Sequence, residues 1–66
     1  MDKLNSDYIK LDQFLKMVNI ISTGGEAKHF LEENIVLVNG VEEHRRGKKL
    51  YPGDVVNVDG RKLIVG

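Results

Sequence analysis

Three turns that contain glycine divide the second half of this 66-residue chain into short segments. Asn39-Gly40 is the strongest short signal for a two-residue β-hairpin, and Pro52-Gly53-Asp54 and Asp59-Gly60 predict two further turns. The segments between the turns are rich in strand-forming residues. The second half is therefore predicted to form a small, mainly antiparallel sheet, with strands over 35–38, 55–58 and 63–65.

Two short helices are predicted ahead of this sheet. The first spans 11–18, where Leu11, Phe14, Leu15 and Val18 recur at helical spacing. With an edge strand over residues 8–10, this order predicts an α+β fold in which two short N-terminal helices pack on the sheet.

The second helix begins with a capping-box pattern, in which Thr23 is followed three residues later by Glu26. It is predicted over 24–33, with Asn34 as its C-terminal stop. The predicted core consists of Leu11, Phe14, Leu15, Val18, Ala27, Phe30, Leu31, Ile35, Leu37, Val55 and Val58.

The length of the chain leaves room for one small domain, which we place over residues 8–66, behind a polar lead-in of residues 1–7. A domain of this size buries only about 60% of the surface of its unfolded chain, which leaves little space for an enclosed active site. There is no cysteine, so disulfides and thiolate zinc sites are excluded. Because no apolar run suits a membrane span and no export signal is present, we expect a cytoplasmic protein without a membrane partner.

No enzyme signature accompanies these elements. His29 and His44 are the only histidines, and neither has the spacing of a catalytic or metal-binding motif. The adjacent acidic pairs at 32–33 and 42–43 do not share a face, so neither forms a general acid–base couple. We therefore expect no catalytic residue, metal site, cofactor or small-molecule substrate.

The formal net charge of zero hides an asymmetry between the two parts of the chain. Residues 1–43 carry four basic and eight acidic side chains, a net charge of −4, whereas residues 44–66 carry six basic and two acidic, a net charge of +4. A local basic patch favours phosphate ligands, although a solvated turn explains it as well. The patch is one segment, here called the basic loop, which consists of Arg45, Arg46, Gly47, Lys48 and Lys49.

The start of the second helix is a candidate anion site. Two glycines at 24–25 lower helix propensity by up to about 1 kcal/mol each relative to alanine, which suggests a close approach to the backbone. Free N–H groups at a helix N-terminus bind anions. The alternative is that the glycines only permit a tight turn between two helices. The candidate phosphate ligands are Ser22, Thr23, Gly25 and Lys28.

Four segments in this order resemble the S4-type RNA-binding domain, also called the alpha-L RNA-binding motif. They are KLDQFL at 10–15, TGGEAK at 23–28, VLVNG at 36–40 and LYPGDVV at 50–56. The resemblance covers about residues 9–58, and the double glycine and the basic loop resemble the short stand-alone bacterial branch of the family. It implies a non-catalytic module that binds structured RNA, such as ribosomal RNA or tRNA.

The resemblance also implies which residues bind RNA, with two departures from the family pattern. Gly24 stands where most members have the arginine of a Ser-Arg pair, and Asn19-Ile20 replaces a glycine that often follows the first helix. The basic loop is expected to compensate for the missing arginine. The predicted RNA-binding residues are Lys10, Ser22, Thr23, Gly24, Gly25, Lys28, Asn39, Arg45, Arg46, Lys48 and Lys49.

Two alternatives stand beside RNA binding. One is an adaptor whose acidic first part binds a basic protein, and the other is a ubiquitin-like sulfur carrier, although the chain ends in Val65-Gly66 and lacks the Gly-Gly that such carriers need. Phosphate contacts alone do not separate RNA from duplex DNA. Because only Tyr8 and Tyr51 are candidates for base stacking, we expect recognition of RNA shape over the reading of single strands.

Overall fold

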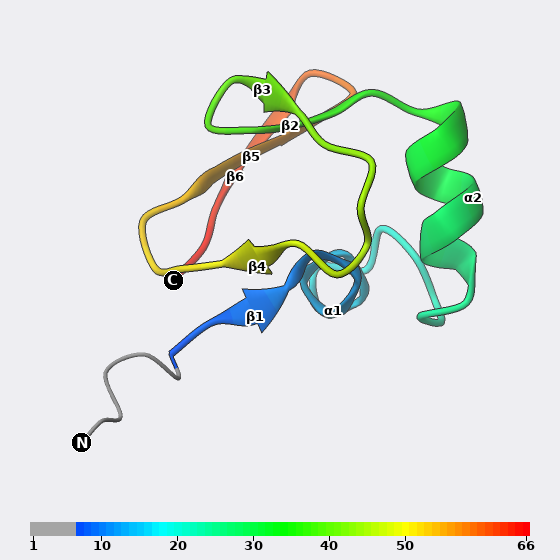
Figure 1. Cartoon of the computed structure of the whole chain (residues 1–66), viewed down its shortest axis with the longest axis horizontal. Helices are drawn as coiled ribbons and strands as arrows, with labels where there is room; N and C mark the ends of the chain where they lie inside the picture. The colour runs from blue at the N-terminus through cyan, green and yellow to red at the C-terminus, as the bar shows by residue number, and fades with distance from the viewer. Residues whose placement is uncertain (1–6) are drawn as a thin grey trace.

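The computed structural model describes residues 7–66 and has the α+β composition that the sequence predicts (Figure 1). The predicted lead-in of residues 1–7 lies outside the described residues, except for Asp7. The elements are β1 (Ile9–Lys10), α1 (Leu11–Met17), α2 (Glu26–Glu33), β2 (Val36–Val38), β3 (Val41–Glu42), β4 (Lys49–Leu50), β5 (Val55–Val58) and β6 (Arg61–Ile64).

The strands form two antiparallel sheets instead of the single sheet predicted. A four-stranded sheet has the order β3-β2-β5-β6, and β1 pairs with β4 in a separate two-stranded sheet. Lys49, the last residue of the basic loop, therefore belongs to a strand. No local pattern predicts this pairing, because the two strands come from opposite parts of the chain and each has only two residues.

The predicted hairpin turns are present. Asn39 and Gly40 have φ angles of 52° and 84°, and Asp59 and Gly60 have 49° and 87°. Positive φ at both central residues is the type I′ geometry, whose twist matches the twist of the flanking strands. These two turns join β2 to β3 and β5 to β6.

The first helix ends without glycine. Asn19 has a φ of 62°, and its N–H donates to the carbonyl of Lys16, while the N–H of Ile20 donates to the carbonyl of Leu15. This is a Schellman ending, in which asparagine takes the left-handed position that glycine usually fills. Neither helix of the described residues is long and apolar enough to cross a membrane.

The second helix begins at Glu26, slightly later than predicted, because residues 24–25 form a turn. Gly25 is the N-cap residue, and no side chain caps the helix, so the role predicted for Thr23 is wrong. The other half of the capping box is present, since the Glu26 carboxylate accepts the Thr23 N–H. At the other end Asn34 is the C-cap residue, as predicted.

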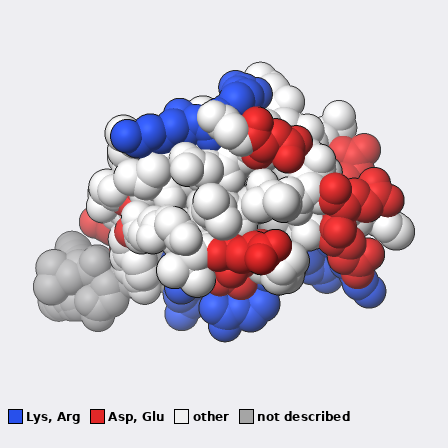
Figure 2. Space-filling view, turned by 90° about the horizontal axis from the view of Figure 1, so that it is seen from above, with Lys and Arg blue, Asp and Glu red and all other residues white. Residues whose placement is uncertain are grey.

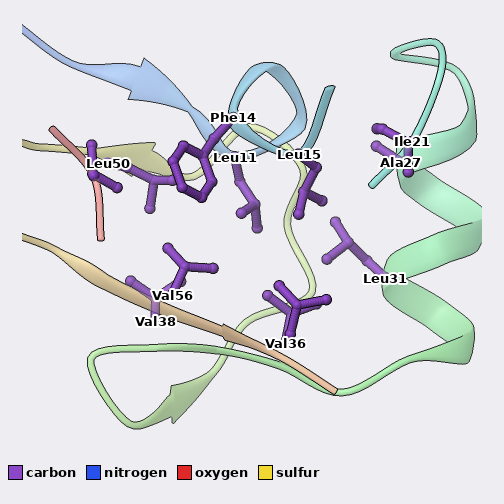
Figure 3. Packing of buried hydrophobic residues seen from close by; sticks show 12 residues of the cluster. Leu11, Phe14, Leu15, Ile21, Ala27, Leu31, Val36, Val38, Leu50 and Val56 are labelled. Atoms are coloured by element: carbon purple, nitrogen blue, oxygen red, sulfur yellow. The ribbon is translucent and has the colours of Figure 1, made fainter. Parts of the chain in front are cut away.

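The core lies between the helices and the inner faces of both sheets (Figure 3). The sequence prediction is mainly wrong about which strand residues are buried. Ile35 is 61% exposed, and Leu37 and Val55 are only partly buried. Side chains alternate along a strand, so an error of one residue reverses the face. Both faces of these strands carry apolar residues, so the sequence lacks the alternation of apolar and polar residues that would identify the buried face. The buried residues are Leu11, Phe14, Leu15, Ile21, Ala27, Leu31, Val36, Val38, Leu50, Val56, Val58 and Val65, with Val18 and Phe30 partly buried against them.

Candidate nucleic-acid interface

The two-stranded sheet brings a lysine from the N-terminal part of the chain to the basic loop. Lys10 lies directly opposite Lys49, and Ile9 lies opposite Leu50. Because side chains alternate along a strand, the buried Leu50 points inward and both lysines point outward. Like charges directly opposite one another destabilise an antiparallel pair. The pairing of two lysines therefore concentrates positive charge on this face.

The same outward face carries two tyrosines. Tyr8 precedes β1, and Tyr51 follows β4. Their ring centroids are 6.0 Å apart, with the planes tilted by 55°. The Nζ of Lys49 lies 4.9 Å from the centroid of the Tyr8 ring, which is a cation–π distance. Cationic and aromatic groups from residues 8–10 and 49–51 thus meet on one surface.

The backbone of the basic loop is anchored to the start of α1. The Leu11 N–H donates to the carbonyl of Lys48 at 2.8 Å, and the Asp12 N–H donates to the carbonyl of Arg46 at 3.0 Å. The first N–H groups of a helix have no partner inside the helix. The loop satisfies them, and in return its path is held against the helix.

Arg45 is already bound to an acidic partner. Its Nε lies 2.9 Å from Oε2 of Glu43, and its Nη2 lies 3.2 Å from Oε1. The hydrogen bond from the Arg45 side chain lowers the pKa of the Glu43 carboxyl from 4.5 to about 2. Both groups therefore stay charged at neutral pH and cancel one another, so Arg45 adds little net charge to the patch.

The N–H groups before α2 are occupied by a carboxylate. Oε1 of Glu26 accepts the N–H of Ser22 at 2.7 Å and the N–H of Thr23 at 3.4 Å. The N–H groups of Glu26 and Ala27 donate to the carbonyls of Thr23 and Gly24, at 3.2 Å each. A phosphate at this turn has to displace or bypass the negative charge of Glu26.

Intramolecular packing does not require glycine at positions 24 and 25. A β-carbon at Gly24 would lie 3.9 Å from Oδ2 of Asp12, and one at Gly25 would lie 3.9 Å from Oγ1 of Thr23, which are ordinary contacts. The Gly24 contact also shows that this turn lies beside the start of α1. The turn and the basic loop therefore flank the same residue, Asp12. Lys28 is exposed on α2.

Asn39 has a structural role inside the protein. Its Oδ1 accepts the N–H of Val55 at 2.9 Å, and its Nδ2 donates to Oδ1 of Asp54 at 3.2 Å. Oδ2 of Asp54 in turn accepts the N–H of Tyr51 at 2.8 Å. The hydrogen bond from the Tyr51 N–H lowers the pKa of Asp54 the most, and the hydrogen bond from Asn39 lowers it further. The exposed Asn39 side chain thus helps to hold the segment that presents Tyr51.

Charge is unevenly distributed over the surface. Figure 2 looks down on the four-stranded sheet and shows a mostly uncharged centre, with basic residues at two opposite margins, an acidic patch beside each of them and further acidic residues on the α2 side. The α2 side carries the exposed Glu26, Glu32 and Glu33. Within residues 7–66, no three acidic or histidine side chains gather closely enough to hold a metal ion.

Sequence reasoning missed three acidic side chains that organise this surface. Glu43 holds Arg45, Asp54 holds the backbone of Tyr51, and Asp12 lies between the basic loop and Gly24. Only Asp54 had a local signal, because Pro52-Gly53-Asp54 marks a turn in which an aspartate commonly accepts a backbone N–H. Glu43 lies only two residues before Arg45, but no motif marked it, and the position of Asp12 beside Gly24 depends on the folded chain.

Comparison with known proteins agrees with this combination of fold and surface. The chain matches the S4 domain family over residues 3–66 and belongs to that family. It is 51% identical over 57 residues to the probable ribosome maturation protein RlbA of Bacillus subtilis (strain 168), an alignment that covers 86% of this chain and 80% of the relative. No solved structure gives a significant match. The family match spans nearly the whole chain and leaves no segment for a sulfur-carrier fold.

Proposed function

We propose that this chain is a small non-catalytic module of the alpha-L type that binds structured RNA, such as ribosomal RNA or tRNA, in the cytoplasm. The observation that carries the proposal is the pairing of Lys10 with Lys49 beside Arg46 and Lys48. Among residues 7–66, no acidic side chain forms an ion pair with any of these four cations. An RNA backbone relieves the repulsion between them by placing phosphates along the face.

The chemistry of the surface supports RNA as the polyanion. The major groove of A-form RNA is too narrow for side chains to read, so proteins bind its shape, phosphates and 2′-hydroxyls. Membership of the S4 family and a relative named for ribosome maturation point in the same direction. The turn at 22–25 and Lys28 extend the proposed contact beyond Asp12, whereas Asn39 acts through Asp54 and Tyr51.

The test is a titration of a hairpin RNA and of a DNA duplex of equal length over a series of salt concentrations. Affinity should fall steeply with salt, with a slope of about 0.7–0.9 in log–log units for each phosphate contact. The triple variant Arg46→Gln, Lys48→Gln, Lys49→Gln should bind weakly and with a shallower slope. The matched control is Arg61→Gln, Lys62→Gln, which removes exposed charge from β6, outside the proposed interface.

Each outcome has a defined meaning. Wild-type affinity in the triple variant would reject the basic loop as the binding site. Equal affinity for RNA and DNA would leave a phosphate-binding surface without selectivity for RNA. Absence of RNA binding at low salt would reject the proposal and favour the adaptor alternative, for which the acidic side of α2 is the candidate surface.

A further inference from the structure

A hollow in the basic surface is bordered by an aromatic ring. It has a volume of about 540 Å³ and is lined by Arg45, Gly47, Lys48, Lys49 and Tyr51. A neighbouring hollow of about 430 Å³, towards the β2–β3 hairpin, shares four of these side chains. The ring and the cations therefore border a shallow depression that is open to solvent.

Tyr51 is exposed, yet its position is held. Its side chain is 43% exposed, whereas the preceding Leu50 is fully buried. The Tyr51 N–H is bound by Asp54, and Asp54 is bound by Asn39. The hydrogen bonds fix the backbone from which the ring projects, so little order has to be imposed when a ligand binds.

The other tyrosine has a different environment. The Nζ of Lys49 lies 4.9 Å from the centroid of the Tyr8 ring, and Tyr8 also borders a separate hollow, whose lining includes Ile9 and Val65. Tyr51 is therefore the aromatic group of the basic hollow. A planar apolar face next to Lys48 and Lys49 matches the two parts of a nucleotide, a base that stacks and a phosphate that pairs with positive charge.

We infer that this hollow binds one unpaired nucleotide of the RNA, with its base stacked on Tyr51 and its phosphates near Lys48 and Lys49. The inference rests on the proposed function and makes it more specific. A base inside a continuous duplex has both faces covered by its neighbours and cannot stack on a side chain. The preferred RNA is thus a structured RNA with a bulged or looped-out base, which goes beyond the recognition of shape that the sequence alone predicts.

Tyrosine fluorescence gives a direct test, because the chain has two tyrosines and no tryptophan. The variant Tyr8→Phe keeps a ring beside Lys49 and leaves Tyr51 as the single fluorophore. It is titrated with a hairpin RNA that carries one bulged adenine, with the same hairpin fully paired, and with the same hairpin carrying an abasic residue in the bulge. The loop of each hairpin is replaced by a non-nucleotide linker, so that no unpaired base is present outside the bulge. Only the bulged adenine should quench the emission, and it should bind most tightly.

Substitution of Tyr51 gives the second measurement. Tyr51→Leu, made in the wild-type chain, should reduce affinity for the bulged hairpin by about 5- to 150-fold, the range expected for loss of one base–aromatic stack. Tyr51→Phe should keep the affinity, and a thermal melt checks that both variants fold. Affinity of Tyr51→Leu for the fully paired hairpin should match that of the wild type.

The outcomes separate the inference from the function on which it rests. Equal binding and equal quenching by the bulged and fully paired hairpins would overturn the unpaired-nucleotide site while leaving RNA binding intact. Quenching by the abasic hairpin as strong as by the adenine bulge would also overturn it. Failure of all three hairpins to bind at low salt would instead reject the proposed function.

Discussion

The two sheets of this protein differ in how they are assembled and in what they present. The four-stranded sheet contains two hairpins whose paired residues are near neighbours in the chain. The two-stranded sheet joins residues 9–10 to residues 49–50. The centre of the outer side of the first is uncharged (Figure 2), with Glu42 and Lys62 on its two edge strands, whereas the second carries Lys10 and Lys49 on its outer side. Local pairings thus build much of the scaffold, and the proposed interface exists only after distant segments have met.

The largest effect should come from breaking the link between the two-stranded sheet and the core. Leu50 in β4 is fully buried, so Leu50→Ala should lower the free energy of unfolding by about 2–5 kcal/mol. A chain of this length has a total stability of only about 3–10 kcal/mol. We therefore expect partial or complete unfolding, measured by urea denaturation followed by circular dichroism.

The control for this change lies on the other sheet. Ile64 in β6 is 62% exposed, so Ile64→Ala should change the free energy of unfolding by no more than about 0.5 kcal/mol. An equal loss of unfolding free energy in both variants would contradict the described burial of Leu50 and exposure of Ile64.

A smaller loss is expected at the turn that holds Tyr51. Asn39→Ala places alanine at a φ of 52° and removes two side-chain hydrogen bonds, and it should lower the free energy of unfolding by about 1–3 kcal/mol. Asn39→Gly accepts the positive φ and loses only the hydrogen bonds, so it should be less destabilised. Thermal melts of both variants make the comparison. A glycine variant as unstable as the alanine variant would show that the positive φ at position 39 does not contribute to the loss of stability.

The ion pair beside the basic loop predicts a dependence of stability on pH. The pKa of Glu43 is about 2 in the folded chain, below its ordinary value of 4.5. Its contribution is therefore fully present above about pH 4.5 and is lost as pH falls towards 2. The lowered pKa of Asp54 acts in the same direction.

The measurement is the melting temperature between pH 2 and pH 7 for the wild type and for Glu43→Gln. The variant should show a weaker decrease in acid, with the remaining decrease due to Asp54 and other carboxylates. Parallel curves for the two proteins would mean that the Glu43–Arg45 pair does not contribute to this dependence.

The smallest expected effect concerns Gly24, in the turn that lies beside Asp12. Packing leaves room for a β-carbon at Gly24, where the S4 resemblance implies an arginine in most family members. Gly24→Arg should strengthen RNA binding and steepen its salt dependence by about one phosphate contact, 0.7–0.9 in slope. Gly24→Gln is the control, because it adds a side chain without charge. Equal salt slopes for the two variants would place this turn outside the interface.

The sequence by itself determined the parts of the fold that depend on neighbouring residues. The helical spacing of Leu11, Phe14 and Leu15 specified α1, and Asn39-Gly40 and Asp59-Gly60 specified two hairpins, because few residues tolerate positive φ. The basic loop was also evident from its composition. These features are local, and a single segment contains the information for each.

Only the tertiary structure decided which strand faces are buried and what surrounds the basic loop. Apolar residues on both faces of β2 and β5 left the register undetermined until the helices covered one face. The pairing of Lys10 with Lys49 and the approach of Tyr8 to Tyr51 join groups from distant parts of the chain, which sequence patterns do not connect. Burial and electrostatic pairing are properties of the folded chain, so the charge that reaches an RNA is set there and not by the count of basic residues.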